Sequence, residues 1–323
     1  MADDLVIRRA TAVDLPGILD VAHVALGWDE DERHGAFFSW KHTENPFGHS
    51  PMWVADDAGE IVAFRTFLRW EWRRPDGSIA RAVRAVDTAT HPDVQGRGLF
   101  RALTMGALDE LVEEGVDFVF NTPNDQSRPG YLKMGWQVIG RPPVRVRPAG
   151  IGGLARLARA RVPAAKWSEP AAFGQSAPDA FADTTELEEL VETFVADGLT
   201  TNRSPAYLQW RFGFAPLHYR VVRRGDRLRD GFAVVRLRRR GGAVEGTVCE
   251  LVVHPGDRRA VGELLDQVEG ADYLLVAGRF SPWQGGLWPL PHQGPQVTWR
   301  AVNQAEPPTL GGWNLTLGDL ELC

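Results

Sequence analysis

Two periods of apolar residues alternate along residues 1–141 and predict helices and strands in mixed order. Apolar positions recur at helical spacing in residues 12–28 and 99–115, and a further helix is expected to begin near Asp29 and end before Pro46. The expected strands are residues 5–11, 50–57, 60–72, 80–90, 116–123 and 136–141. With a short helix at 127–135, this order predicts an α+β fold, a mixed and mostly antiparallel sheet flanked by helices.

The same order of elements returns in the second half of the chain. The spacing W-[K/R]-x4-P occurs at Trp40 and again at Trp210, and the His-Pro pair at 91–92 returns at 254–255. The offsets are 210 − 40 = 170 and 254 − 91 = 163 residues, so the landmarks stay nearly in register. Strands are expected at 218–225, 229–240, 245–255 and 271–279, with a helix at 257–270. We infer a tandem duplication of one fold.

The duplication divides the chain into three parts. We expect an amino-terminal domain over residues 1–147, a linker over 148–178 and a carboxy-terminal domain over 179–323. The linker is rich in Ala, Pro and Gly, and its arginine-bearing segment at 151–167 predicts one short amphipathic helix. We favour a helix that covers a surface between the domains, and a membrane-surface role is the alternative.

The composition is that of an ordinary globular chain. Its 323 residues are 44% hydrophobic and 24% charged, which suffices for two domains. A net charge of −6 disfavours binding to a phosphate backbone, so no nucleic-acid partner is expected. No run approaches ~20 apolar residues and the first residues are acidic, so we expect a cytoplasmic protein without a membrane partner. Cys249 and Cys323 lack metal-ligand spacing, so free thiols and no metal are expected.

The turn after the expected strand at 80–90 has the composition of a diphosphate site. The N–H groups that begin a helix converge on one point, and the helix dipole favours an anion there. Gly96 and Gly98 allow close approach of the backbone, and Gln95, Arg97 and Arg101 add side-chain donors. The turn is neither a Walker loop nor a dinucleotide fingerprint. The alternative is a plain helix entry whose glycines serve only the turn.

Two sequence blocks stand in the first half. The turn reads Gln95-Gly96-Arg97-Gly98-Leu99-Phe100. The second block, N-x-x-S-x-x-x-Y-x-x-x-G-aromatic, is formed by Asn124, Ser127, Tyr131, Gly135 and Trp136. Together they resemble the GNAT superfamily of acyl-CoA-dependent N-acyltransferases, whose turn carries Q/R-x-x-G-x-G/A; Phe100 replaces the last small residue. The resemblance covers most of residues 5–141 and implies two tandem GNAT-like domains.

The resemblance implies an acyl-CoA site. In the family the fourth and fifth strands part, and the pantetheine arm lies in the gap, where it would pair here with backbone groups near Thr88, Ala89 and Thr90. A strand N–H would stabilise the oxyanion, and the pyrophosphate would rest on the turn. The implied binding residues of the two blocks are Gln95, Gly96, Arg97, Gly98, Leu99, Phe100, Asn124 and Ser127. Acetyl-CoA is the expected co-substrate, with acetyl as the default acyl group.

The resemblance also implies two catalytic residues. Tyr131 stands where many relatives keep a tyrosine that protonates the departing thiolate; its alternative role is a packed aromatic. Asp87 lies in the strand beside the acyl site and could remove the proton of the amine, directly or through water. Asp87 could instead brace a neighbouring loop by hydrogen bonding. Some relatives carry a glutamate nearer the start of this strand, and this chain has Ala82 at that position.

The acceptor is expected to enter over the loop between the first two helices. The acidic residues there, which would attract a cationic amine, are Asp29, Glu30, Asp31 and Glu32. The same run also reads as a capped helix start, because Asp29 and Glu32 have capping-box spacing. Residues that could wall an organic substrate, or equally form core, are Trp28, Trp40, Trp53, Trp70 and Trp72.

The second copy lacks both family blocks. Its turn has only Gly256, and residues 280–294 hold too many Pro and Gly for a regular helix where the second block would stand. We expect this half to keep the fold, to have lost the cofactor site, and to shape the acceptor cleft. The leading function is N-acyltransfer to a small-molecule amine. The alternatives are a non-catalytic acyl-CoA-binding protein and an aminoacyl-tRNA-dependent transferase, and the oligomeric state is left open.

Overall fold

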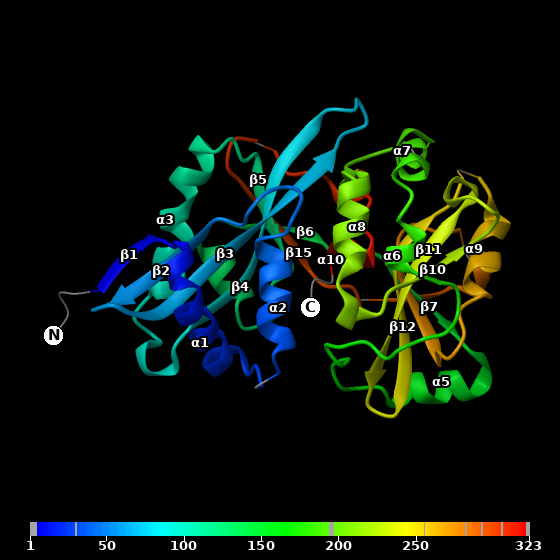
Figure 1. Ribbon diagram of the computed structural model, residues 1–323, viewed down its shortest axis with the longest axis horizontal. Helices are drawn as coiled ribbons and strands as arrows, with labels where there is room; N and C mark the ends of the chain where they lie inside the picture. Colours follow the sequence, from blue (N-terminus) through cyan, green and yellow to red (C-terminus); the bar gives the residue numbers. More distant parts are fainter. Residues whose placement is uncertain are drawn as a thin grey trace. The chain divides into compact units, whose positions relative to one another are not determined.

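The chain forms two compact units in the computed structural model (Figure 1). The structure describes residues 5–29, 31–193, 197–254, 256–281, 283–291, 293–304 and 306–320. The amino-terminal unit consists of residues 1–140 and 296–309, and the carboxy-terminal unit of residues 141–295 and 310–323. This division differs from the continuous domains 1–147 and 179–323 expected from sequence, because each unit is completed by a segment from the other half of the chain.

The amino-terminal unit is a mixed sheet with helices on both faces. Its strands, in sheet order, are β1 (Leu5–Arg9), β2 (Met52–Asp57), β3 (Glu60–Arg73), β4 (Ile79–Thr90), β5 (Phe118–Asn121), β15 (Val297–Ala301) and β6 (Gln137–Gly140). Neighbours along this order are antiparallel except β4 and β5, which are parallel. This confirms the α+β fold with a mixed, mostly antiparallel sheet.

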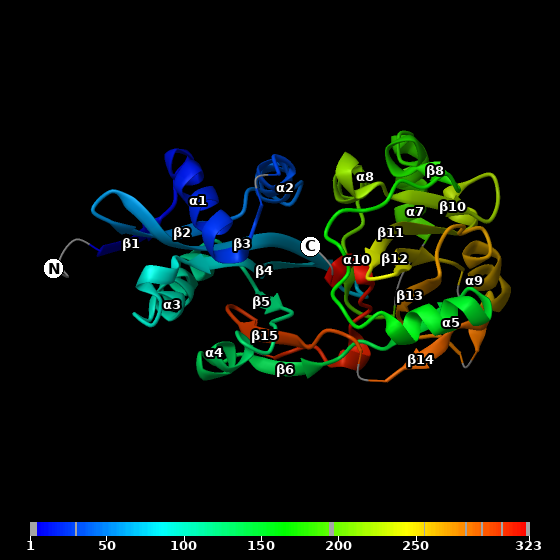
Figure 2. The ribbon, with the colours of Figure 1, turned by 90° about the horizontal axis from the view of Figure 1, so that it is seen from below.

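Helices cover both faces of this sheet. They are η1 (Ala12–Asp14), α1 (Leu15–Leu26), α2 (Arg33–His42), η2 (Pro92–Val94), α3 (Leu99–Glu113) and α4 (Arg128–Lys133). Figure 2 shows α1 and α2 on one face and α3 and α4 on the other. Each face has its own apolar cluster, around Ile18, Phe38 and Phe64 under α1 and α2, and around Phe67 and Leu103 under α3.

The carboxy-terminal unit has the same sheet topology. Its strands, in sheet order, are β8 (Gln175–Ser176), β10 (Arg220–Arg223), β11 (Phe232–Arg240), β12 (Ala243–Val252), β13 (Tyr273–Ala277), β7 (Val144–Pro148) and β14 (Trp288–Leu290). Its remaining elements are α5 (Gly150–Arg159), α6 (Ala177–Ala180), α7 (Thr184–Thr193), β9 (Thr200–Thr201), α8 (Pro205–Gly213), η3 (Ala215–Leu217), η4 (Leu228–Asp230), α9 (Arg258–Leu265), η5 (Gln284–Gly286), η6 (Leu310–Gly312) and α10 (Leu317–Leu320). The parallel pair is β12 and β13, which correspond to β4 and β5. The two sheets fit the duplication inferred from the landmarks.

Each half of the chain contributes one strand to the other unit. β15 lies between β5 and β6, and β7 lies between β13 and β14. Local sequence pattern predicts that a segment is extended, but not which sheet it joins. This exchange is why the boundary at residue 147 was wrong.

Residues 148–178, expected to be a linker, form part of the carboxy-terminal unit. They include the end of β7, all of α5 and β8, and the start of α6. The expected short amphipathic helix is α5; its Leu157 packs against a cluster with Val146 and Tyr273, whereas Ile151 is 90% exposed. No helix within the described part of the chain has both the length and the apolar composition needed to cross a membrane.

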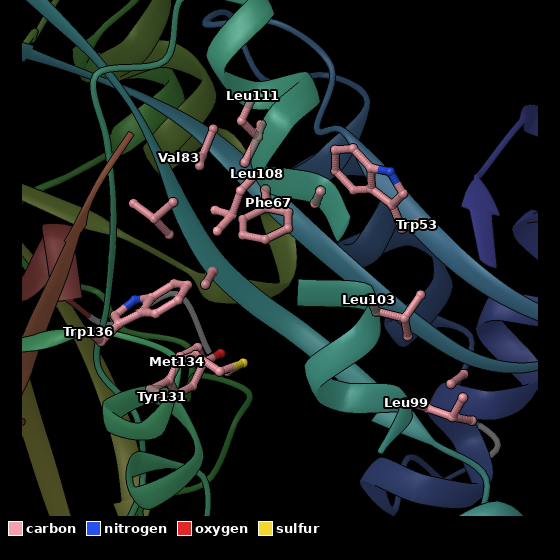
Figure 3. Packing of buried hydrophobic residues seen from close by; sticks show 14 of the residues in the cluster. Trp53, Phe67, Val83, Leu99, Leu103, Leu108, Leu111, Tyr131, Met134 and Trp136 are labelled. Atoms are coloured by element: carbon pink, nitrogen blue, oxygen red, sulfur yellow. The ribbon is translucent and has the colours of Figure 1, made fainter. Parts of the chain in front are cut away.

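The core under α3 and α4 positions the groups discussed below. Figure 3 shows Leu99 and Leu103 along α3, Phe67 and Val83 on the strands, and Tyr131 with Met134 and Trp136 at α4. Of the tryptophans proposed as substrate walls, four are buried core residues: Trp40, Trp53, Trp70 and Trp72. Their aromatic area stabilises the sheet.

The exchanged strand β15 should be essential for the stability of the amino-terminal unit. Trp299 on β15 is 1% exposed and packs near Phe118 of β5. Trp299→Ala should reduce the free energy of unfolding by about 3–5 kcal/mol, because it removes a large side chain from a closed core. Urea unfolding followed by circular dichroism measures the change. Trp283→Ala, at a site that is 65% exposed, is the matched control and should change it by less than about 1 kcal/mol. Equal effects would contradict the role of β15.

Candidate functional site

β4 and β5 part after a short stretch of pairing. Their register runs only from Ala82 opposite Phe118 to Arg84 opposite Phe120, although β4 continues to Thr90. His91 donates its N–H to Val62 O of β3 at 2.8 Å, so by strand alternation the N–H and C=O groups of Thr90 and Thr88 point away from β3. Beyond Arg84, the described structure therefore leaves one edge of β4 open to an extended ligand.

A β-bulge interrupts β4 within this open stretch. Arg65 of β3 lies opposite Thr88 and Thr66 lies opposite Val86, so Asp87 is the extra residue. Asp87 has φ 39°, in the left-handed region that residues other than glycine adopt rarely. Thr66 Oγ1 donates to Val86 O at 2.7 Å and fixes the strand on one side of the bulge.

The Asp87 side chain is held by two buried neighbours on α2. Lys41 Nζ lies 2.5 Å and His42 Nε2 lies 2.8 Å from Asp87 Oδ2. Burial alone raises the pKa of Asp87, but the Lys41 charge and the His42 hydrogen bond outweigh it and hold that pKa well below its usual range. Burial lowers the pKa of His42, so its ring is neutral. Its Nε2 donates a hydrogen bond to Asp87, and its Nδ1 accepts a hydrogen bond of 2.9 Å from the Ser50 hydroxyl.

These contacts brace β4 against the helix α2, whereas the alternative role given for Asp87 was to brace a neighbouring loop. Both Asp87 contacts from α2 use Oδ2, and the side chain retains 16% exposure. No described residue is bonded to Oδ1, so this oxygen can face an incoming amine. The role of Asp87 as a base stays a prediction, and its low pKa favours binding a cation over accepting a proton.

The turn at Gln95–Phe100 opens α3 without a side-chain cap. Gly96 and Gly98 have φ 79° and 78°, and Gly98 is the N-cap residue of α3. Gly98 offers no oxygen-bearing side chain, so the first N–H groups of the helix stay available for an anion. The exposed Arg97 lies 3.6 Å from Asp57, and the exposed Arg101 follows in the first helical turn.

The other expected residues of the turn divide between surface and core. Gln95 Nε2 donates to Thr90 O at 3.3 Å, which ties the turn to the end of β4. The Leu99 side chain is 4% exposed and belongs to the core, so only its backbone can face a ligand. Ala89 also points its side chain into a core, the one under α1.

Phe100, the departure from the family pattern, turns inward. Its ring packs edge-on against Tyr131 at 5.3 Å. A Cβ added at Gly130 would lie 3.1 Å from the Phe100 ring, so a glycine on α4 makes room for it. The large side chain therefore fills space between α3 and α4 and does not cover the outer surface of the turn.

Tyr131 is 3% exposed on α4 and close to the parting strands. Its hydroxyl oxygen accepts a hydrogen bond of 2.6 Å from Nη2 of Arg65, which is fully buried on β3. Asn124 caps the turn before α4, because its Oδ1 accepts from Ser127 N and Ser127 Oγ, each at 2.9 Å. Asn124 and Ser127 thus organise the helix that carries Tyr131, and their contact with a cofactor stays a prediction.

The acidic run before α2 does not form the expected capping box. Glu32 is the N-cap of α2 without a side-chain hydrogen bond, and Asp29 lies 2.9 Å from His34 Nε2 instead. Asp31 Oδ1 accepts from the backbone N–H of Arg33 at 3.0 Å and so takes the role expected of Asp29. Trp28 stacks on the His34 ring at 4.9 Å. Glu30 lies outside the described residues.

Sequence reasoning missed three residues of this site: Arg65, Lys41 and His42. Arg65 alternates with Ala63 and Phe67 on a buried strand face, and a charge at such a position was the available signal. Lys41 served only as a landmark of the repeat. The role of its charge is visible only in the folded chain, where Lys41 lies beside Asp87. The two residues are 87 − 41 = 46 positions apart in the sequence.

The corresponding place in the carboxy-terminal unit is filled by the chain itself. β12 bulges at Cys249, since Val234 lies opposite Glu250 and Val235 opposite Val248. At the start of α9, Asp257 accepts from the N–H groups of Arg259 and Ala260, each at 3.1 Å. These backbone bonds, the Ala260 N–H first, lower the pKa of Asp257. A protein carboxylate thus occupies the position where α3 is open.

The described structure holds no group of three or more His, Cys, Asp or Glu side chains that could bind a metal ion. Cys249 is buried and forms no disulfide among the residues described. Cys323 and Pro255 lie outside those residues.

Comparisons with known proteins agree with this architecture. Residues 6–139 match the family model of the acetyltransferase (GNAT) domain. No curated protein sequence matches the chain significantly. Among solved structures, a probable N-acyltransferase of unknown function from Enterococcus faecalis has a TM-score of 0.64 at 10% identity, over 93% of this chain and 73% of that chain.

Two further solved structures are similar over nearly the whole chain. The GCN5-related N-acetyltransferase from Kribbella flavida has a TM-score of 0.60 at 16% identity, over 93% of this chain and 72% of that chain. Eis1 from Mycobacterium abscessus has a TM-score of 0.58 at 16% identity, over 92% of this chain and 73% of that chain. At these identities the similarity establishes the fold.

The buried Lys41–Asp87 pair should make stability depend on pH. The depressed pKa of Asp87 gives a stabilising contribution that is present above the unfolded value of about 4 and is lost as pH falls towards the folded pKa. Asp87→Asn should therefore lower the free energy of unfolding by about 3 kcal/mol at pH 7, because it leaves Lys41 buried and unpaired. The loss should be about 1 kcal/mol smaller at pH 3, one unit below the unfolded pKa, where the unfolded chain takes up a proton while the folded Asp87 stays ionised.

Urea unfolding at the two pH values measures this difference. Asp93→Asn, at a carboxylate with 86% exposure, is the control and should have little effect at either pH. A loss for Asp87→Asn that is the same at pH 3 and pH 7 would contradict the ion pair.

Proposed function

We propose that this protein, whose residues 6–139 belong to the GNAT family of acetyltransferase domains, transfers an acyl group from acyl-CoA to the amine of a small metabolite. Acetyl is the default acyl group. The observation that carries the proposal is the continuity of the open β4 edge with the uncapped start of α3. An extended arm that ends in a diphosphate requires these two features side by side.

The chain can bind acyl-CoA along this line. Backbone groups of Thr88 and Thr90 point away from β3 and can pair with the amides of the pantetheine arm. The N–H groups that follow Gly98 can bind the pyrophosphate, and Arg97 and Arg101 add charge at the exposed rim. The inward turn of Phe100 leaves that surface open.

The residues around the parting strands can serve the transfer step. A β4 N–H near Thr88 would stabilise the oxyanion that forms when the amine attacks the thioester carbonyl. Tyr131 would donate its proton to the sulfur as the carbon–sulfur bond breaks. Asp87 would attract the ammonium form of the acceptor. The acceptor nitrogen would then transfer its proton to Asp87 or to water.

One acyl-CoA site per chain follows from the comparison of the two helix starts. Asp257 already binds the N–H groups at the start of α9, so a diphosphate there would meet a carboxylate. The net charge of −6 supports a small amine over a tRNA substrate.

Substitution of Gly98 should weaken acyl-CoA binding selectively. Gly98→Trp places a large side chain at the start of α3 and forces a strained φ of 78° on a residue with a Cβ. Acetyl-CoA affinity, measured by calorimetry, should fall at least about tenfold, since the lost N–H contacts are charge-assisted. Gly256→Trp is the matched control, because Gly256 has φ 85° in the corresponding turn, and it should leave affinity unchanged. Equal affinities for both variants would reject the site.

Removal of the Tyr131 hydroxyl should reduce turnover and spare binding. Tyr131→Phe should lower kcat by ~10²- to 10⁴-fold, the usual range for general acid catalysis, with little change in the Kd of acetyl-CoA. It should also cost about 1–3 kcal/mol of stability, because Arg65 loses its hydrogen-bond partner.

The matched control for Tyr131→Phe is Tyr219→Phe in the carboxy-terminal unit. Tyr219 accepts a similar bond of 2.7 Å from Arg211. Its loss should lower the melting temperature in the same way and leave kcat unchanged. If Tyr131→Phe keeps full kcat, Tyr131 is a packing residue.

A further inference from the structure

Arg65 is a buried cation without a counter-charge. It is 0% exposed on β3, on the sheet face covered by α3 and α4. Its Nη2 donates to Tyr131 Oη at 2.6 Å, whereas Nε and Nη1 are bonded to no residue of the described structure. Charged side chains are rarely buried to this degree unless they are paired. The fold therefore keeps a positive charge in place that the described residues do not neutralise.

Aromatic rings surround the guanidinium and offset part of its desolvation. Arg65 Cζ lies 4.9 Å from the centre of the Phe67 ring, 5.3 Å from that of Tyr131 and 5.6 Å from that of Phe100. Cation–π contacts of this kind stabilise a charge without cancelling it. Phe100, which replaces the small residue of the family pattern, thus completes the enclosure of Arg65.

Arginines in the carboxy-terminal unit are buried differently. Arg211 also donates to a tyrosine, Tyr219, but in addition binds the carbonyl oxygen of Gly318 with Nε and Nη2. Arg238 is paired with the carboxylate of Glu245. Both units thus contain a buried arginine that donates to a tyrosine. In the carboxy-terminal unit the arginine, Arg211, also binds a backbone oxygen, whereas Arg65, beside the parting strands β4 and β5, does not.

The direction of the Arg65–Tyr131 bond determines where the phenol proton can go. A guanidinium only donates, so Tyr131 Oη is the acceptor in this bond. The Tyr131 O–H then has to point elsewhere, and among the described residues it has no acceptor. The Tyr131 hydroxyl is therefore free to donate its proton to a ligand, while its oxygen is hydrogen-bonded to the Arg65 guanidinium.

We propose that Arg65 is a positioning residue that directs the Tyr131 proton to the thioester sulfur and stabilises the negative charge that forms there as CoA leaves. This inference rests on the proposed function. As the nitrogen–carbon bond forms, the carbon–sulfur bond breaks with its electron pair on sulfur, and Tyr131 gives its proton to the sulfur. The phenolate faces Arg65 until it regains a proton from water, and the proton that the amine nitrogen loses on forming the amide restores that water. A unit charge about 6 Å from the sulfur, at an effective dielectric constant near 20, changes such an equilibrium by roughly 100-fold.

Binding of CoA and acetyl-CoA tests the charge without turnover. Of the two ligands, only CoA has a free thiol, and the thiol ionises increasingly as the pH rises above 7. In the wild-type protein the affinity for CoA relative to acetyl-CoA, measured by calorimetry, should rise about tenfold between pH 7 and pH 9. In Arg65→Met the rise should be less than about twofold, and Arg65→Lys, which keeps the charge, should recover part of it. Replacing a buried charge by an apolar side chain of similar size is generally tolerated by a fold.

A kinetic double-mutant cycle tests whether Arg65 acts through Tyr131. Arg65→Met should lower kcat by about 10- to 100-fold in the wild-type background and have no further effect in Tyr131→Phe. Arg211→Met is the matched control and should change the melting temperature without changing kcat or the pH dependence of CoA binding.

The possible failures are distinguishable. If Arg65→Met shows the wild-type rise in relative CoA affinity, or if its kcat loss simply multiplies with that of Tyr131→Phe, the role of Arg65 is overturned while the proposed function stands. If the wild-type protein binds neither CoA nor acetyl-CoA, the proposed function is overturned and this inference with it.

Discussion

The ion pair between Lys41 and Asp87 is the interaction on which the amino-terminal site depends. It holds an aspartate in a left-handed conformation at a bulge, and the bulge bends β4 within the stretch that no longer pairs with β5. His42 at the end of α2, and Ser50 in the segment before β2, extend the pair into a buried chain of polar groups. The open edge of β4, the turn at Gly98 and the start of α3 come directly after Asp87 in the sequence. The ion pair at Asp87 therefore positions the strand that leads into the site.

The two units show how one topology can keep or lose a ligand site. Both sheets part after a short parallel pairing, and both carry a bulge at the corresponding strand. They differ at the helix that follows: α3 begins at Gly98 with its N–H groups open, whereas α9 begins at Asp257, whose carboxylate binds them. The same helix start thus attracts either an external anion or an internal carboxylate.

Sequence predicted the local elements well and the long-range ones poorly. The periodic segments around α1, α3, β3 and β4 formed as expected, and the turn at Gly96 and Gly98 has the positive φ values that glycine permits. The exchange of β7 and β15 was missed, because strand pairing between distant segments leaves no local pattern. Arg65 was missed for a related reason: its meaning depends on Tyr131, which only the folded chain brings within 2.6 Å.

The most direct test of the account is the release of free CoA from acetyl-CoA in the presence of a library of small amines, with the acylated product identified by mass spectrometry. The account predicts that at least one amine gives CoA and N-acyl product in equal amounts, and that the rate falls steeply in Tyr131→Phe. Tight binding of acetyl-CoA without release of CoA for any amine would contradict it and would make this chain an acyl-CoA-binding protein.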